Sequence, residues 1–137
     1  MQRFYRKRRT PIYWLLMALV LFGLYGCTPT GSLEYEKESA GALKGRLQLK
    51  GLQKNHEYVL SLNGYPGKPG NDSLPQLYGS EGYVDFTSVT SDNKGEIKTE
   101  INVPLPQGKY TVKFLVKDPE ANWQIVWQKE FLTFSIN

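Results

Sequence analysis

The pattern of hydrophobic and polar positions changes twice along the chain. Residues 12–27 form an apolar run, and the stretch 28–41 that follows has no sustained hydrophobic period. From Ala42 onward, apolar residues recur at every second position, as in a β-strand with one buried and one solvated face. The pattern therefore divides the chain into an apolar leader (1–27), a flexible tether (28–41) and one β-domain (42–137).

Alternation within the domain predicts its strands. We expect the first two strands to form an antiparallel hairpin. Beyond Trp123 the alternation changes phase near Gln128, which predicts two short strands with a turn between them, or alternatively a single strand with a bulge. The five segments with uninterrupted alternation are 43–49, 58–62, 83–90, 97–103 and 110–116.

Short strands, turn residues at intervals of about ten and no helical period predict an all-β fold. We expect an antiparallel Ig-like β-sandwich of about six or seven strands after an N-terminal apolar signal helix. The stretch GEIKTEINVPLPQGKYTVKFLV, residues 95–116, loosely resembles the strand–turn–strand unit of bacterial Ig-like and carboxypeptidase-regulatory-like domains. That resemblance implies an architecture and names no activity.

The leader has the three parts of a secretory signal: a basic start, an apolar middle and a small residue before a cleavage point. Its last four residues, Leu24-Tyr25-Gly26-Cys27, resemble the bacterial lipobox. The resemblance implies a diacylglyceryl thioether on Cys27, cleavage before it and acylation of the new amino group. In a bacterium with two membranes, Thr28 after the cysteine implies sorting to the outer membrane. The alternatives are an ordinary signal peptide and an uncleaved signal anchor, although the run is shorter than the roughly 20 residues of a typical spanning helix.

The chain's positive charge belongs to the leader. Five of its 17 Lys and Arg residues precede Ile12, whereas all 13 Asp and Glu residues lie at Glu34 or later. The exported part is therefore close to neutral, and the basic pI does not indicate a nucleic-acid partner. Basic residues before an apolar segment favour retention on the cytoplasmic side, which places the domain on the other side of the membrane.

Few residues are available for site chemistry. With one cysteine, Cys27, and one histidine, His56, the chain has no internal disulfide and no site built from several His and Cys ligands. We expect His56 to be a surface turn residue. The segment Asp92-Asn93-Lys94-Gly95-Glu96 resembles half of a Ca²⁺ loop, but we favour a turn chosen for backbone geometry. We therefore expect no catalytic residues, no metal and no cofactor.

The aromatic residues are the best candidates for a binding surface. They cluster near the long Gly- and Pro-rich loop 63–82 and in the late strands. Exposed together they would form a platform for a sugar or a peptide; the alternative, which we favour, is that the large rings fill the core. The candidate residues are Tyr65, Tyr78, Tyr83, Trp123 and Trp127.

These observations predict a lipid-anchored cell-envelope protein, in the cell membrane or the outer membrane. The sandwich would bind a protein or glycan partner, or serve a structural role, without being an enzyme. The alternative is a small envelope enzyme, or a metal-dependent domain, that uses carboxylates near the long loop. A single-pass signal-anchored protein is the alternative topology.

Overall fold

The computed structural model describes residues 28–74 and 82–137. Within these residues the fold is all-β, as predicted, and consists of eight strands in two sheets with one short 3₁₀ turn. The signal helix predicted before Cys27 lies outside the described residues. In the part of the chain that the structure describes, no helix is both long and apolar enough to cross a membrane.

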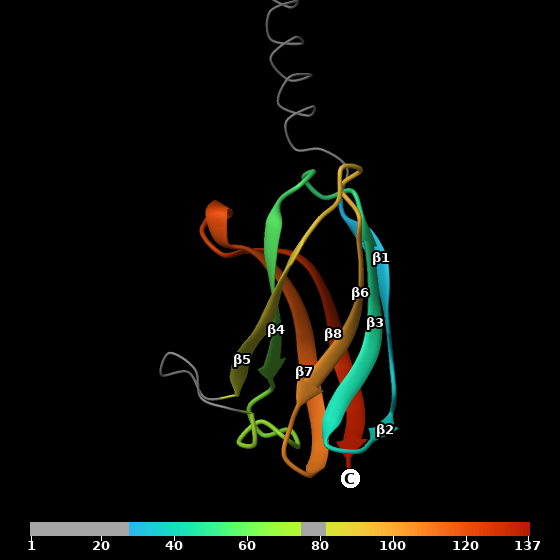
Figure 1. Ribbon diagram of the computed structural model, residues 1–137. Helices are drawn as coiled ribbons and strands as arrows, with labels where there is room; N and C mark the ends of the chain where they lie inside the picture. Colours follow the sequence, from blue (N-terminus) through green and yellow to red (C-terminus); the bar gives the residue numbers. More distant parts are fainter. Residues whose placement is uncertain (1–27, 75–81) are drawn as a thin grey trace, which may run out of the picture.

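The two sheets contain three and five strands (Figure 1). The three-stranded sheet has the order β1-β3-β6, and the five-stranded sheet has the order β2-β8-β7-β4-β5. The elements are β1 (Thr30–Tyr35), β2 (Glu38–Ser39), β3 (Ala42–Lys50), β4 (Glu57–Gly64), β5 (Tyr83–Thr90), β6 (Ile97–Pro104), β7 (Gly108–Asp118), η1 (Pro119–Ala121) and β8 (Gln124–Ile136).

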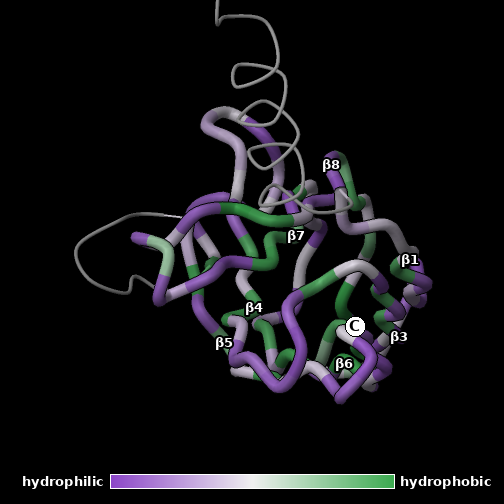
Figure 2. The backbone as a smooth tube through the Cα atoms, turned by 90° about the horizontal axis from the view of Figure 1, so that it is seen from above, coloured by the Kyte–Doolittle hydropathy of each residue, from purple (hydrophilic) through white to green (hydrophobic). Residues whose placement is uncertain are grey.

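Both sheets contribute to one hydrophobic core, so the arrangement is sandwich-like. Alternate residues of β3, β6 and the first part of β7 enter this core, and most of the residues between them are at least partly exposed. Figure 2 looks down the strands and shows this alternation of hydrophobic and hydrophilic residues along the chain. Apolar residues with 0% exposure come from β3 (Leu47), β4 (Leu60, Leu62), β7 (Tyr110, Val112, Phe114, Val116) and β8 (Leu132).

The prediction of a flexible tether over 28–41 is wrong. Strand β1 pairs antiparallel with β3 from Thr30 to Tyr35, and β2 pairs parallel with β8. Only Leu33 of β1 is buried in the core, which explains why the segment shows no hydrophobic period. Backbone pairing at a sheet edge therefore orders a segment whose composition is typical of a linker. With β1 and β2 the fold has eight strands and not six or seven. The parallel pairing of β2 with β8 also means that the fold is not wholly antiparallel.

The predicted hairpin between the first two domain strands is also wrong. Strand β3 pairs with β1 and β6, whereas β4 pairs with β5 and β7. The connection 51–56 thus crosses from one sheet to the other. Alternation shows which face of a strand is buried, but both sheets bury a face against the same core, so the pattern does not reveal the sheet to which a strand belongs.

The phase change near Gln128 is a bulge, the alternative to the expected turn. Strand β8 runs unbroken beside β7. The register of this pair shifts twice, between Val112 and Phe114 of β7 and again between Val116 and Lys117 of β7. Phe131, at the first irregularity, has a φ of 54°. Each extra residue reverses the side-chain phase and bends the strand, as β-bulges do.

The segment 92–96 is a turn that joins β5 to β6, in agreement with the favoured prediction. Asp92 Oδ1 accepts hydrogen bonds from the backbone N–H groups of Lys94 (2.8 Å) and Glu96 (2.9 Å). Gly95 provides the left-handed conformation, with a φ of 73°. The carboxylate therefore stabilises the turn itself.

We expect acid to weaken this turn. The hydrogen bonds from the backbone of Glu96 and then of Lys94 lower the pKa of Asp92 below its ordinary value of 3.8. A carboxyl group with a lowered folded-state pKa stabilises the fold above the ordinary pKa, and the contribution is lost as pH falls through the lowered value. Urea denaturation between about pH 2 and 6 should show a shallower acid loss for Asp92→Asn, which keeps the acceptor oxygen without the charge. Equal acid dependence in the two proteins would contradict this account.

Candidate functional site

Exposed apolar side chains gather on the outer face of the five-stranded sheet. Among the described residues, the large hydrophobic side chains that remain exposed are Trp123 (51%), Ile125 (46%) and Phe131 (61%), all in β8 or directly before it. Ile125 is paired with the outward-facing Lys117 of β7, and Phe131 stacks on Tyr65. Single exposed apolar residues are common, but a group on one face indicates a binding surface.

A pocket of about 610 Å³ lies on this face. Strand β7 forms its floor. Strands β4 and β5 form one wall, and the other wall is formed by β8 and the residue directly before it. The volume is in the range typical of small-molecule sites. The residues around it are Asn63, Tyr83, Asp85, Leu115, Lys117, Trp123 and Ile125.

An ion pair lies at the edge of the pocket floor. Lys117 Nζ donates a hydrogen bond to Asp85 Oδ1 at 2.8 Å, and the Tyr83 hydroxyl donates to the same oxygen at 2.8 Å. Ser61 Oγ is a third donor to this oxygen. The Lys117 side chain is 8% exposed and that of Asp85 21%. Burial lowers the pKa of Lys117, and the adjacent carboxylate opposes this effect by favouring the charged form.

Two aromatic rings flank the ammonium group. Lys117 Nζ lies 4.3 Å from the centroid of the Tyr83 ring and 5.3 Å from that of Trp123. Both distances are within the range of cation–π attraction. The lysine thus joins rings from β5 and from the β7–β8 connection, which fixes the two walls of the pocket relative to each other.

The β7–β8 connection holds Trp123 in an uncommon backbone conformation. Asn122 and Trp123 have φ values of 54° and 61°. Positive φ is a true outlier for a bulky residue and costs on the order of 1–3 kcal/mol. The connection is fixed by Asp118, which caps η1 through the N–H groups of Glu120 and Ala121 and contacts His56 Nε2 at 2.8 Å. Strain of this kind clusters at functional sites.

The structure separates the aromatic residues predicted as a binding surface. Tyr83 and Trp123 lie together at the pocket. Tyr65 lies on the same face, where its ring stacks on Phe131 with 4.8 Å between centroids. Trp127 instead packs edge-on against Phe114 and the core. Tyr78, like the lipidation candidate Cys27, lies outside the described residues.

Sequence reasoning did not identify Lys117 or Phe131, and Asp85 was considered only among the carboxylates of the alternative, metal-dependent function. One sequence feature could have indicated that part of this face is covered: the apolar Leu115 falls in the outward phase of β7, and in the structure it is 3% exposed. An apolar residue in the solvated phase of a strand indicates that something covers that side. No comparable sequence feature marks Asp85 or the bulge at Phe131.

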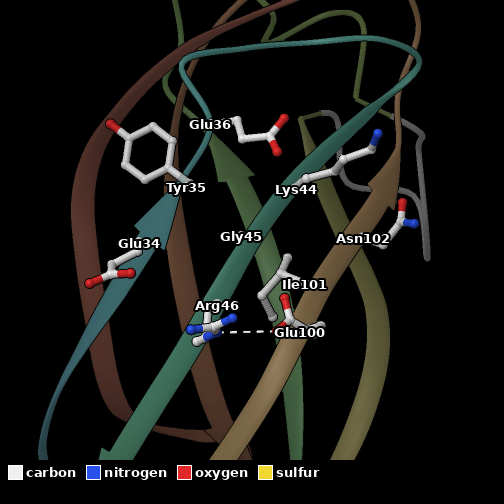
Figure 3. Close-up of a pocket in the computed structure, with 9 residues that line it drawn as sticks. All are labelled: Glu34, Tyr35, Glu36, Lys44, Gly45, Arg46, Glu100, Ile101 and Asn102. Atoms are coloured by element: carbon white, nitrogen blue, oxygen red, sulfur yellow. Dashed lines mark hydrogen bonds and ion pairs between the residues drawn. The ribbon is translucent and has the colours of Figure 1, made fainter.

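The outer face of the three-stranded sheet has a different character. Its shallow hollow of about 470 Å³ is bordered mainly by charged residues from β1, β3 and β6 (Figure 3). Arg46 Nε contacts Glu100 Oε1 at 3.1 Å, and both side chains are more than half exposed. Exposed pairs of this kind contribute little free energy. We interpret this face as a solvated surface of mixed charge.

His56 is mostly buried, contrary to the expectation of a surface turn residue. Its imidazole contacts the carboxylates of Asp118 and Glu120, and its backbone N–H donates to Ser91 Oγ at 3.0 Å. The serine thus contacts the peptide group of His56, and the geometry is not that of a nucleophile beside its base. Across residues 28–74 and 82–137, no group of three or more His, Cys, Asp or Glu side chains is arranged to hold a metal ion.

The geometry of the pocket and of the face around it is the basis for assigning a function. No model of a known protein family matches the chain, and no curated protein matches it either.

Proposed function

We propose that this protein is a lipid-anchored cell-envelope protein, without enzymatic activity, whose Ig-like sandwich binds an envelope protein or a glycan. One observation carries the binding role: the two outer faces differ in kind. The face of β1, β3 and β6 is charged, whereas that of β8, β7, β4 and β5 carries Trp123, Ile125 and Phe131 in exposed positions. An exposed group of aromatic and aliphatic side chains favours a partner on the second face.

Two features support an Ig-like architecture. In the lettering of Ig strands, β1-β3-β6 corresponds to A-B-E, and β2-β8-β7-β4-β5 corresponds to A′-G-F-C-C′. In addition, the Tyr110 hydroxyl, near the start of β7, donates to the carbonyl of Pro106 at 2.6 Å. This contact resembles the tyrosine corner found at the E–F connection of Ig domains.

Removing this hydroxyl should weaken the fold modestly. Tyr110→Phe keeps the buried ring, which stacks on Phe134, and removes the hydroxyl group, which donates to Pro106 and also contacts the Ser73 side chain. We expect the unfolding free energy to fall by about 0.5–1.5 kcal/mol, the net value of a typical hydrogen bond. Urea denaturation measures it. Tyr35→Phe is a matched control, because the Tyr35 hydroxyl only accepts a long contact of 3.4 Å from Thr133 N–H. A larger loss of unfolding free energy for Tyr35→Phe than for Tyr110→Phe would argue against a tyrosine corner at Tyr110.

The proposed anchor is close to the folded domain. Strand β1 begins at Thr30, three residues after Cys27. Three residues span at most about 10 Å when fully extended. A lipid on Cys27 would therefore hold the sandwich against the membrane surface, with little freedom to stand away from it.

Mass spectrometry of the membrane fraction tests the anchor. We expect a mature N-terminus at Cys27 that carries the mass of two or three acyl chains, because a single chain binds membranes only marginally. The control is Cys27→Ser, which should lose the acyl mass. An intact Met1 in the membrane fraction would instead show an uncleaved signal anchor and contradict the lipoprotein assignment.

Site-specific crosslinking in cells tests the binding face. A photoreactive residue at position 125, on the outer face of β8, should give discrete adducts with an envelope protein or a glycan. The matched control is position 48, an exposed position on the outer face of β3. Equal labelling from both positions, or none from position 125, would count against a binding role for this face.

A further inference from the structure

We propose that the pocket between Tyr83 and Trp123 binds an uncharged pyranose ring of a glycan. This inference rests on the proposed function, in which the outer face of the five-stranded sheet binds a partner, and it selects one chemical class for the pocket. It is carried by the combination of aromatic walls, an apolar floor and unused polar groups in a single cavity of about 610 Å³.

The aromatic walls suit the apolar face of a sugar. One face of a pyranose ring presents mainly C–H groups, which pack against the electron-rich face of an indole or phenol ring. Trp123 is 51% exposed, and both Trp123 and Tyr83 line the pocket beside Lys117. Leu115 and Ile125 complete an apolar surface that would be desolvated by a bound ring.

The polar groups suit the hydroxyls. All three hydrogen bonds that Asp85 accepts from described residues use Oδ1, so no described residue donates to Oδ2. The side-chain amide of Asn63 has no hydrogen bond to a described residue, and both residues line the pocket. A carboxylate oxygen accepts from a hydroxyl, and an amide both donates and accepts, so the two side chains offer partners to the hydroxyls of a bound ring.

Charge argues against an anionic ligand. Among the described residues that line the pocket, Lys117 is the one basic side chain, and it is already paired with Asp85 at 2.8 Å. A carboxylate, sulfate or phosphate would meet no uncompensated positive charge. An extended peptide fits less well, because the floor strand β7 has β4 and β8 as paired neighbours and offers no free backbone edge within the pocket.

Titration of the full chain with oligosaccharides tests the inference. The protein is purified in a zwitterionic detergent without a sugar headgroup and titrated with cellotetraose, maltotetraose, the tetramer of N-acetylglucosamine and, as the charged comparison, tetragalacturonate. Calorimetry gives Kd, and the indole N–H resonance of Trp123 reports occupancy. We expect at least one neutral tetramer to bind with Kd of about 1 mM or lower and more tightly than tetragalacturonate.

Three variants locate the site. Trp123→Gly removes the ring and suits the positive φ of this position, so the backbone is retained. We expect it to raise Kd at least about tenfold, and Asp85→Asn to raise it severalfold. Gln48→Ala, at an exposed position on the outer face of β3 in the other sheet, is the control and should leave Kd within about twofold. Thermal melts confirm that each variant is folded.

The outcomes separate this inference from the proposed function. If no neutral tetramer binds, or if Trp123→Gly binds the sugar as tightly as the unmodified protein, the pyranose site is overturned. Protein adducts from a photoreactive residue at position 125 would then still support the proposed binding face, with a protein as its partner. If a neutral tetramer binds and Trp123→Gly and Asp85→Asn both weaken it, the pocket is a sugar site.

Discussion

Replacing Phe114 with alanine is expected to lower the unfolding free energy by about 3–5 kcal/mol, the usual range for an aromatic residue removed from a core. Phe114 is 0% exposed at the centre of β7. Its ring makes edge-to-face contacts with Phe86 of β5 and Trp127 of β8, at centroid distances of 5.8 and 6.4 Å. Strands on both sides of β7 would therefore lose a partner, and a cavity would remain between them.

Urea denaturation followed by circular dichroism measures this loss. Small domains are commonly stable by only about 5–15 kcal/mol, so this loss would be a large fraction of the total free energy of unfolding. Phe131→Ala is the matched control, because it deletes the same side chain at a position that is 61% exposed. We expect that control to cost no more than about 1 kcal/mol, since its main loss is the stacking on Tyr65. Similar losses in the two variants would contradict the assignment of Phe114 to the core.

Replacing Lys117 with methionine is expected to destabilise the protein by about 2–3 kcal/mol. The substitution keeps the length and packing of the side chain but leaves Asp85 without its cation. Breaking a fully buried ion pair costs about 3–5 kcal/mol, and the 21% exposure of the Asp85 side chain reduces that figure. The attraction of the ammonium group to the rings of Tyr83 and Trp123 is lost as well.

A double-mutant cycle isolates the ion pair. Asp85→Asn removes the carboxylate charge, so Lys117→Met should cost less in that background than alone. The expected coupling is about 1–2 kcal/mol, measured from four urea denaturation curves. A coupling near zero would show that the effect of Lys117→Met comes from the lost ring contacts and not from the pair.

Much of the fold could be predicted from the alternation of the strands. The segment 110–116 has the cleanest alternation, and it became β7, the strand at the centre of the core. Alternation failed where a strand buries little, as in β1 with Leu33, and it could not assign β3 and β4 to different sheets. Pairing of this kind is decided by contacts between residues far apart in the sequence.

The candidate site was less predictable. Tyr83 and Trp123 were singled out because aromatic residues cluster near the long loop and in the late strands, and the structure places both at the pocket. Lys117 was not, because a lysine in the outward phase of a strand is ordinarily solvated. Its burial arises from Tyr83 on β5 and from Trp123 beyond η1, and the left-handed backbone at Asn122 and Trp123 that allows this has no sequence pattern.

The parallel pairing of β2 with β8 has a mechanical consequence. The start of β1 and the end of β8 lie at opposite ends of the domain (Figure 1). Tension between these ends would pull β2 and β8 in opposite directions along their length, and so load their hydrogen bonds in shear. These bonds include Ser135 N–H to Lys37 O at 2.8 Å and Asn137 N–H to Ser39 O at 2.9 Å. Bonds loaded in shear resist together, whereas bonds that are unzipped fail one at a time, so this short pairing would act as a clamp against pulling.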